Sequence, residues 1–184
     1  MVWNELIFMK NIDQKKHQRP VRPTALQILR SLVGAFIGIG AVAVLEQFFL
    51  DDTDVTLVIG AFGATAVLVF GTPSSPLAQP YNVVVGHLVS AMVGVVIFQI
   101  IGEANWLSAS LAVALAIVAM QITNSVHPPG GASALIAVVS SPEIHNLGFL
   151  YVVYPVGVGA IILIAVACVS NNLYNNQRWP VFWL

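Results

Sequence analysis

Apolar residues fill most of the chain from residue 26 onward, and polar interruptions divide this region into six segments. The segments run over 26–50, 55–71, 81–101, 106–123, 132–139 and 147–169. A membrane-spanning helix needs about 20 mostly apolar residues. The second segment is near the lower limit of about 17, and the fifth is too short to span alone. Because backbone groups in lipid must be hydrogen-bonded internally, the pattern predicts an all-α fold, a polytopic membrane helix bundle.

The six segments fall into two halves, which we interpret as internal repeats of a long span, a short broken span and a long span. Residues 63–70 match residues 131–138 at an offset of 68, with three identities, and each copy ends in a Ser/Pro turn. Paired short segments of this kind mark the binding site in many transporters. We therefore expect a basic N-terminal segment over 1–26, membrane repeats over 27–101 and 102–170, and a short tail over 171–184.

Charge is scarce and unevenly placed. Only 8% of the residues are charged, 58% are hydrophobic and the net charge is −1, which excludes a soluble enzyme, a nucleic-acid binder and a disordered chain. Six of the seven basic residues lie in the first 30 positions, and residues 31–177 contain no Lys or Arg. The positive-inside rule then predicts a multi-pass protein of the cell (inner) membrane with both termini in the cytoplasm. No cleavable signal peptide is expected, and residues 1–9 suit the membrane interface.

The number of full crossings has two solutions, because both termini on one side require an even number. Six crossings place all the acidic residues between 46 and 143 on the outer side. Four crossings, with the second and fifth segments dipping in and returning, place Glu103 on the inner side. Acidic residues have little influence on topology, so both solutions stay open.

The strongest local signal is the stretch His-Pro-Pro-Gly-Gly-Ala-Ser-Ala over 127–134. The two prolines lack backbone N–H donors and favour an extended approach to the next helix. The two glycines let a ligand or a neighbouring helix come close to the backbone. We expect a helix to start after them with free N–H groups, which would favour an anion. The alternative is a kinked loop that only packs.

An anion in this region would have to be held without Lys or Arg. The candidate substrate-binding residues are helix-start glycines, hydroxyls, an amide and a histidine: His127, Gly130, Gly131, Ser133, Asn124, Ser125, Gly63 and Thr65. Candidates for proton coupling are His127, His87 and Glu46, since ionisable residues within spans are functional hypotheses by default. A neutral, hydrogen-bonded histidine and an interfacial Glu46 are the alternatives.

These motifs resemble the HPP family of integral membrane proteins. The resemblance rests on 31–39, on Gly63-Ala64-Thr65-Ala66 with its proline-rich continuation, and on 124–135. Members from plants and cyanobacteria are similar to nitrite transporters of the chloroplast envelope or the cell membrane. The resemblance therefore implies a carrier for a small inorganic anion, with nitrite as the first candidate.

Two other function classes remain open. One is a structural or assembly subunit of the membrane. The other is a membrane redox protein in which His87 and His127 ligate a haem. No carboxylate pair, HExxH motif or nucleophile–base set indicates an enzyme, and no cofactor or metal is expected. The expected partners are the lipid bilayer, a small inorganic anion and a second or third copy of the chain, packed through the face of Gly34, Gly38 and Gly40.

Overall fold

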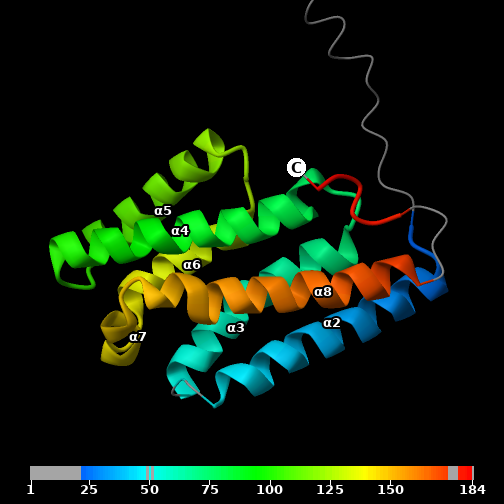
Figure 1. Cartoon of the computed structure of the whole chain (residues 1–184), viewed down its shortest axis with the longest axis horizontal. Helices are drawn as coiled ribbons and strands as arrows, with labels where there is room; N and C mark the ends of the chain where they lie inside the picture. The colour runs from blue at the N-terminus through cyan, green and yellow to red at the C-terminus, as the bar shows by residue number, and fades with distance from the viewer. Residues whose placement is uncertain (1–21, 49, 51, 174–177, 184) are drawn as a thin grey trace, which may run out of the picture.

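The structure is a computed structural model that describes residues 22–48, 50, 52–173 and 178–183. The segment expected at the membrane interface over 1–9, and most of the basic segment over 1–26, lie outside these residues. The described residues form helices and no strand, which confirms the all-α prediction (Figure 1). The helices are α2 (Ala25–Glu46), α3 (Asp52–Ala66) with η1 (Val67–Gly71), η2 (Pro76–Ala78), α4 (Pro80–Ile101), α5 (Trp106–Ile122), α6 (Pro128–Val139), α7 (Pro142–Leu147), and η3 (Val152–Gly157) with α8 (Val158–Asn172).

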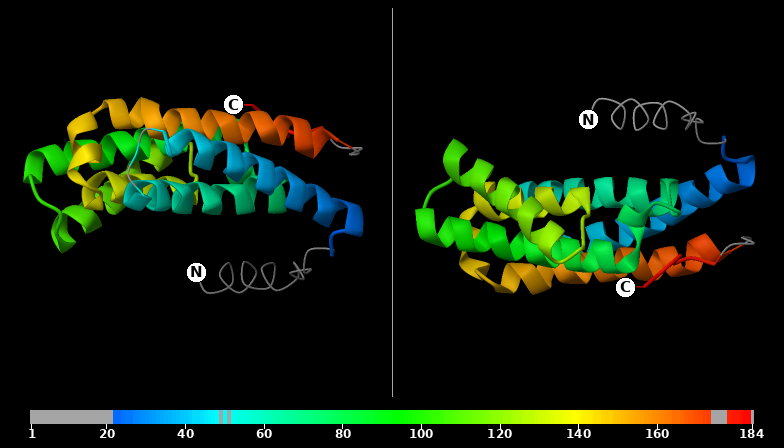
Figure 2. Two further views of the ribbon diagram at one scale, coloured as in Figure 1. Left: turned by 90° about the horizontal axis from the view of Figure 1, so that it is seen from below. Right: turned by 90° about the horizontal axis from the view of Figure 1, so that it is seen from above.

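Three of these helical stretches are long and apolar enough to cross a membrane. They are Ala25–Glu46, Pro80–Ile101 and Val152–Asn172, and the shorter apolar helices α3, α5 and α6 run alongside them (Figure 2). Large apolar side chains on the outside are strongly exposed, among them Phe36 at 78% and Ile122 at 79%. A surface of this kind is stable against lipid rather than water, so the bundle is a membrane protein.

Successive passes alternate in direction, so the helix ends gather at two ends of the bundle (Figure 1). Arg22 and Arg30 stand at the start of α2. Arg178 lies at the same end, because the N–H of its neighbour Trp179 donates to Asn172 of α8, next to the Asn171 carbonyl oxygen that Arg30 contacts. The end of α2, the start of α3 and helix α7 lie at the opposite end, where they carry Glu46, Asp54 and Glu143. Both the six-crossing and the four-crossing solution place these residues in this way, so the number of full crossings stays a prediction. The internal repeat stays a prediction.

The helix boundaries differ from the predicted segments at two informative places. The helix of the short fifth segment begins at Pro128 rather than after the glycines. Pro128 and Pro129 occupy its first two positions, which tolerate proline because their N–H groups would have no partner within the helix. The sixth span is interrupted near its start. Tyr154 has extended backbone angles (φ −134°, ψ 127°), and Pro155 follows it without a backbone donor.

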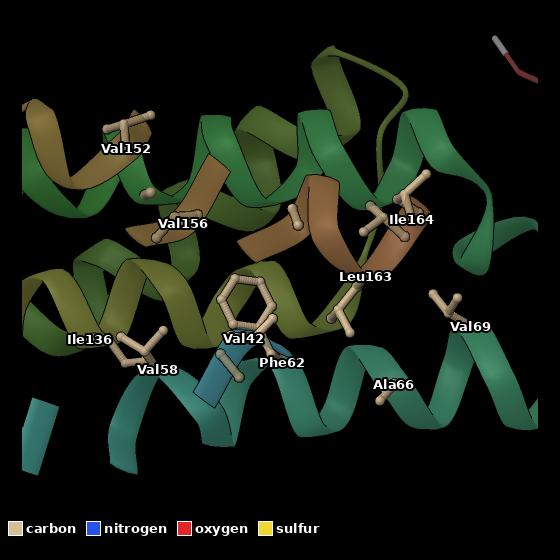
Figure 3. Packing of buried hydrophobic residues seen from close by; sticks show 14 of the residues in the cluster. Val42, Val58, Phe62, Ala66, Val69, Ile136, Val152, Val156, Leu163 and Ile164 are labelled. Carbon is tan, nitrogen blue, oxygen red and sulfur yellow. The ribbon is translucent and has the colours of Figure 1, made fainter. Parts of the chain in front are cut away.

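The core has one larger cluster of buried apolar side chains, in which Phe62, Val42 and Leu163 meet between α3, α2 and α8 (Figure 3). Gly34 and Gly38 of α2 are buried in the same bundle. A Cβ on Gly34 would lie 2.7 Å from Phe70, and one on Gly38 would lie 2.9 Å from Leu163. The expectation that this glycine face serves as an interface between copies is therefore wrong for these two residues. They face the chain's own helices, while Gly40 has open space around it.

Candidate functional site

Four polar side chains from the helices α3, α4 and α6 meet in the interior of the bundle. Thr65, His87 and His127 are 0% exposed, and Ser133 is 2% exposed. The Thr65 hydroxyl lies 2.8 Å from His87 Nε2 and 3.0 Å from His127 Nε2. The Ser133 hydroxyl lies 2.8 Å from His87 Nδ1. We call these four residues the His–Thr cluster.

The cluster is assembled where the two short helices α3 and α6 meet the long helix α4. Thr65 is next to last in α3, just before the chain widens into the π-helical turn η1. His127 is the N-cap of α6, and Ser133 lies in the second turn of that helix. His87 lies on the buried face of α4. Thr65 and Ser133 occupy equivalent positions under the 68-residue offset. Their hydroxyls contact the two ring nitrogens of His87.

Two glycines allow the histidines to come together. A Cβ on Gly86 would lie 2.7 Å from His127 Cβ and 2.7 Å from the Ser125 carbonyl oxygen. A Cβ on Gly130 would lie 2.8 Å from the Gly86 carbonyl oxygen. Because these glycines have no side chain, α4 can pack closely against the start of α6. The ring centroids of His87 and His127 are then 4.9 Å apart, with an angle of 59° between the ring planes.

The hydrogen-bond partners fix the direction of each bond in the neutral cluster. His127 Nδ1 lies 2.8 Å from the Leu77 carbonyl oxygen, which only accepts, so this nitrogen is the donor. Nε2 of His127 then accepts from the Thr65 hydroxyl, whose oxygen accepts from His87 Nε2. His87 Nδ1 in turn accepts from the Ser133 hydroxyl. The result is one continuous chain of donors from Ser133 to the Leu77 carbonyl, with both histidines neutral.

The cluster also has room for one added proton. The Thr65 hydroxyl lies 3.3 Å from the Ala61 carbonyl oxygen, a second acceptor one turn back along α3. If His127 gains a proton on Nε2, that nitrogen donates to Thr65 and the Thr65 hydroxyl turns toward Ala61. Every polar atom of the two residues keeps a partner in both arrangements. A proton can therefore enter without leaving a buried group unsatisfied.

The start of α6 presents fewer backbone donors than expected. Pro128 and Pro129 have no N–H, and the Gly130 N–H donates to the His127 carbonyl oxygen at 2.8 Å. The first three positions of the helix, which normally carry the free donors, thus offer none. The expectation of free N–H groups at this helix start is corrected, and side-chain donors become the groups available to a ligand.

The other predicted site residues lie outside the cluster. Asn124 is exposed, with a left-handed backbone (φ 51°). The buried Ser125 pairs its hydroxyl with Thr123 at 2.7 Å. Gly131 and Gly63 are half-buried, and a Cβ on either would meet nothing nearer than 3.9 Å. Glu46 is fully buried at the C-terminal end of α2 and has no hydrogen bond to either histidine.

Three groups near the cluster were not expected from the sequence. Tyr151 is fully buried, and its hydroxyl donates to the Ser133 carbonyl oxygen at 3.0 Å. The Leu77 carbonyl ends the donor chain. Ser90 follows His87 by three residues, a spacing that places both on one helix face. Its buried hydroxyl has no hydrogen-bond partner in the described part of the chain, and it lies 3.0 Å from the place that a Cβ on Gly130 would take.

Comparison with known proteins places the chain in a family. The family described as "HPP, transmembrane region" matches residues 20–180. Two proteins of Dictyostelium discoideum, each described as a transmembrane protein, are 42% and 39% identical to it. The alignments cover 89% and 96% of this chain but 53% and 62% of the relatives, so the chain spans little more than half of their length. No solved structure matches. The match over residues 20–180 shows that the chain belongs to the HPP family of transmembrane proteins.

Proposed function

We propose that this protein carries a small inorganic anion across the membrane, with nitrite as the first candidate substrate, and that it catalyses no chemical reaction. The observation that carries the proposal is the His–Thr cluster, a buried pair of histidines in an otherwise apolar bundle whose hydrogen bonds can be rearranged to accommodate one added proton. Intramembrane ionisable residues usually mark an ion or substrate pathway.

Charge compensation supports this role for the histidines. An unpaired anion in a low-dielectric interior is costly, and residues 31–177 contain no Lys or Arg to pair with it. The histidines are the side chains there that can become cationic. A protonated cluster and a monovalent anion together form a neutral pair, so the anion and the proton would move in the same direction.

Donors for the anion's oxygen atoms are present beside the histidines. Ser90 has a buried hydroxyl without a partner, and it lies next to the start of α6. The hydroxyls of Thr65 and Ser133 already bond to the histidines and can turn toward a ligand. A small planar anion such as nitrite has two oxygen acceptors and needs few such donors. Nitrite is the first candidate among small anions because the chain resembles HPP-family members that are similar to nitrite transporters.

The test is anion uptake by proteoliposomes that hold the purified chain. A nitrite gradient should drive uptake, and an inward proton gradient should increase it. We expect His127→Gln and Thr65→Val to reduce the flux at least tenfold. Glutamine keeps a polar side chain but cannot carry the proton, and valine keeps the shape of threonine without its hydroxyl.

His145→Gln is the matched control. His145 stacks on Phe98, with ring centroids 3.5 Å apart, and is not part of the His–Thr cluster. This variant should transport like the unaltered protein. Equal flux in His127→Gln would overturn the assignment of the site. Failure of the unaltered protein to carry nitrite, nitrate or formate would overturn the transport proposal and favour the structural-subunit alternative.

The haem alternative is disfavoured by the geometry of the histidines. Both Nε2 atoms face the same Thr65 hydroxyl at 2.8 and 3.0 Å, which leaves no space for a porphyrin between the two rings. A purified protein without a Soret band would agree with this reasoning.

We also propose that the chain lies in the cell (inner) membrane as a homodimer or homotrimer, with both termini in the cytoplasm. Reporter domains fused to each end, active on only one side of the membrane, test the orientation. Light scattering of the detergent-solubilised protein tests the number of copies. Reporters active on opposite sides, or a monomer alone, would overturn the respective part.

A further inference from the structure

A groove of about 280 Å³ opens between the start of α2 and the end of α8, at the end of the bundle that carries the basic residues. Its apolar walls come from Leu26, Leu29, Val33 and Leu173. The exposed fractions of these side chains are between 46% and 54%. These half-exposed walls are therefore accessible from outside the bundle, and in a membrane the surrounding medium is lipid.

The polar part of the groove contains donors for which the described residues provide no acceptor. Arg30 donates from Nη1 to the Asn171 carbonyl oxygen at 3.4 Å, a long bond, while its buried Nε has no partner among the described residues. Ser170 also lines the groove, and its buried hydroxyl has no partner within the described part of the chain. No acidic residue is among those that line the groove. A guanidinium held in this way is expected to have an external anionic partner.

The depth of Arg30 decides between a free anion and a lipid. Arg30 is the sixth residue of α2, so it lies roughly 7 Å along the helix axis from Ala25. Val33 follows almost one turn further toward the bundle centre. A phosphate at Arg30 would thus have an apolar wall directly below it, where a phospholipid has its acyl chain.

We propose that this groove binds one phospholipid whose headgroup carries a net negative charge. Its phosphate oxygens accept hydrogen bonds from the guanidinium of Arg30, which lines the groove. One acyl chain lies over Leu26, Leu29 and Val33. The described residues that line the groove include no carboxylate to neutralise the positive charge of Arg30, so an anionic lipid is preferred over a zwitterionic one. The inference is independent of the transport proposal.

Native mass spectrometry of the full chain in detergent tests it with two lipids, phosphatidylglycerol and phosphatidylcholine. One basic residue near anionic lipid contributes about 1 kcal/mol, so we expect a preference for phosphatidylglycerol of about fivefold. Arg30→Gln should abolish the preference. Arg178→Gln is the matched control, because Arg178 is exposed at the same end but does not line the groove. This control should keep the preference.

A photo-crosslinking amino acid at Leu29 gives a second measurement that leaves Arg30 intact. We expect an adduct with the mass of phosphatidylglycerol, which phosphatidylcholine supplied at the same concentration forms several-fold less. The same probe at the exposed Ile28, which does not line the groove, should show no such preference.

Four results would overturn the proposal. The two lipids could bind equally, or Arg178→Gln could remove the preference as fully as Arg30→Gln. In a thermal-stability assay of the detergent-solubilised protein, inorganic phosphate could raise the Tm as much as phosphatidylglycerol does, which would make the groove a site for free phosphate. The crosslink at Leu29 could instead join residues 1–20 of the same chain, which would make the N-terminal segment the occupant.

Discussion

Replacing Gly94 by alanine tests how closely α4 and α6 approach each other. A Cβ on Gly94 would lie 2.4 Å from the Ala134 carbonyl oxygen and 2.9 Å from Ala134 Cα. A carbon and a carbonyl oxygen normally stay at least about 3.3 Å apart. The two helices would therefore have to separate by roughly 1 Å, because the opposing atoms belong to a helix backbone and cannot rotate away.

The cost follows from two opposing effects. Alanine favours a helix by up to about 1 kcal/mol relative to glycine. Overpacking a tight interior site typically costs about 1–3 kcal/mol. Gly60→Ala on α3 measures the first effect alone, because a Cβ there would meet nothing within 4 Å. We therefore expect Gly94→Ala to be about 1–3 kcal/mol less stable than Gly60→Ala.

Both variants can be compared by heating the detergent-solubilised protein and measuring the fraction that remains monodisperse. For a chain of this size, about 1 kcal/mol corresponds to roughly 2–4 °C in Tm. The Tm of Gly94→Ala should thus fall several degrees below that of Gly60→Ala. The separation of α6 should also move Ser133, the neighbour of Ala134, away from His87, so nitrite flux should fall as well. Equal Tm values for the two variants would refute the close approach of α4 and α6.

Three further substitutions test individual contacts. Tyr151→Phe removes the hydrogen bond to the Ser133 carbonyl oxygen and should lower the free energy of unfolding by about 1 kcal/mol, measured as a lower Tm. Asp54→Ala removes the acceptor of the Ser141 N–H and hydroxyl, and should increase hydrogen exchange in α7, measured by mass spectrometry. Gly131→Ala should leave the Tm unchanged or raised, because the nearest atom to its Cβ would be 3.9 Å away.

The spans and the central histidines could be predicted from the sequence because each follows from a local property. Length and hydropathy mark Pro80–Ile101 as a span, and a histidine within it stands out by its chemistry. Thr65 and Ser133 were predicted as hydroxyl donors for an anion, and both belong to the cluster. These inferences need no knowledge of which helix packs against which.

The remaining parts of the site depend on tertiary contacts, which the sequence does not reveal. The Leu77 carbonyl is a partner of His127 only because the proline-rich turn lies beside the start of α6. Gly63 and Gly130 look equivalent as helix glycines, yet one faces open space and the other faces the Gly86 carbonyl oxygen. Which glycine approaches a neighbouring backbone is decided by the helix crossing, not by the motif.

The lack of Lys and Arg in the core suits an anion carrier better than a fixed charge would. A permanent guanidinium beside His87 would have to be paired in the empty state, since a lone buried charge is costly, and its partner would compete with the substrate. The neutral cluster needs no such partner. Its polar atoms satisfy one another through Thr65, and the same hydroxyl can turn to Ala61 when His127 is protonated. On the proposed function, positive charge therefore arises at the site only when a proton arrives, and the empty carrier can reset through the membrane with an uncharged His–Thr cluster.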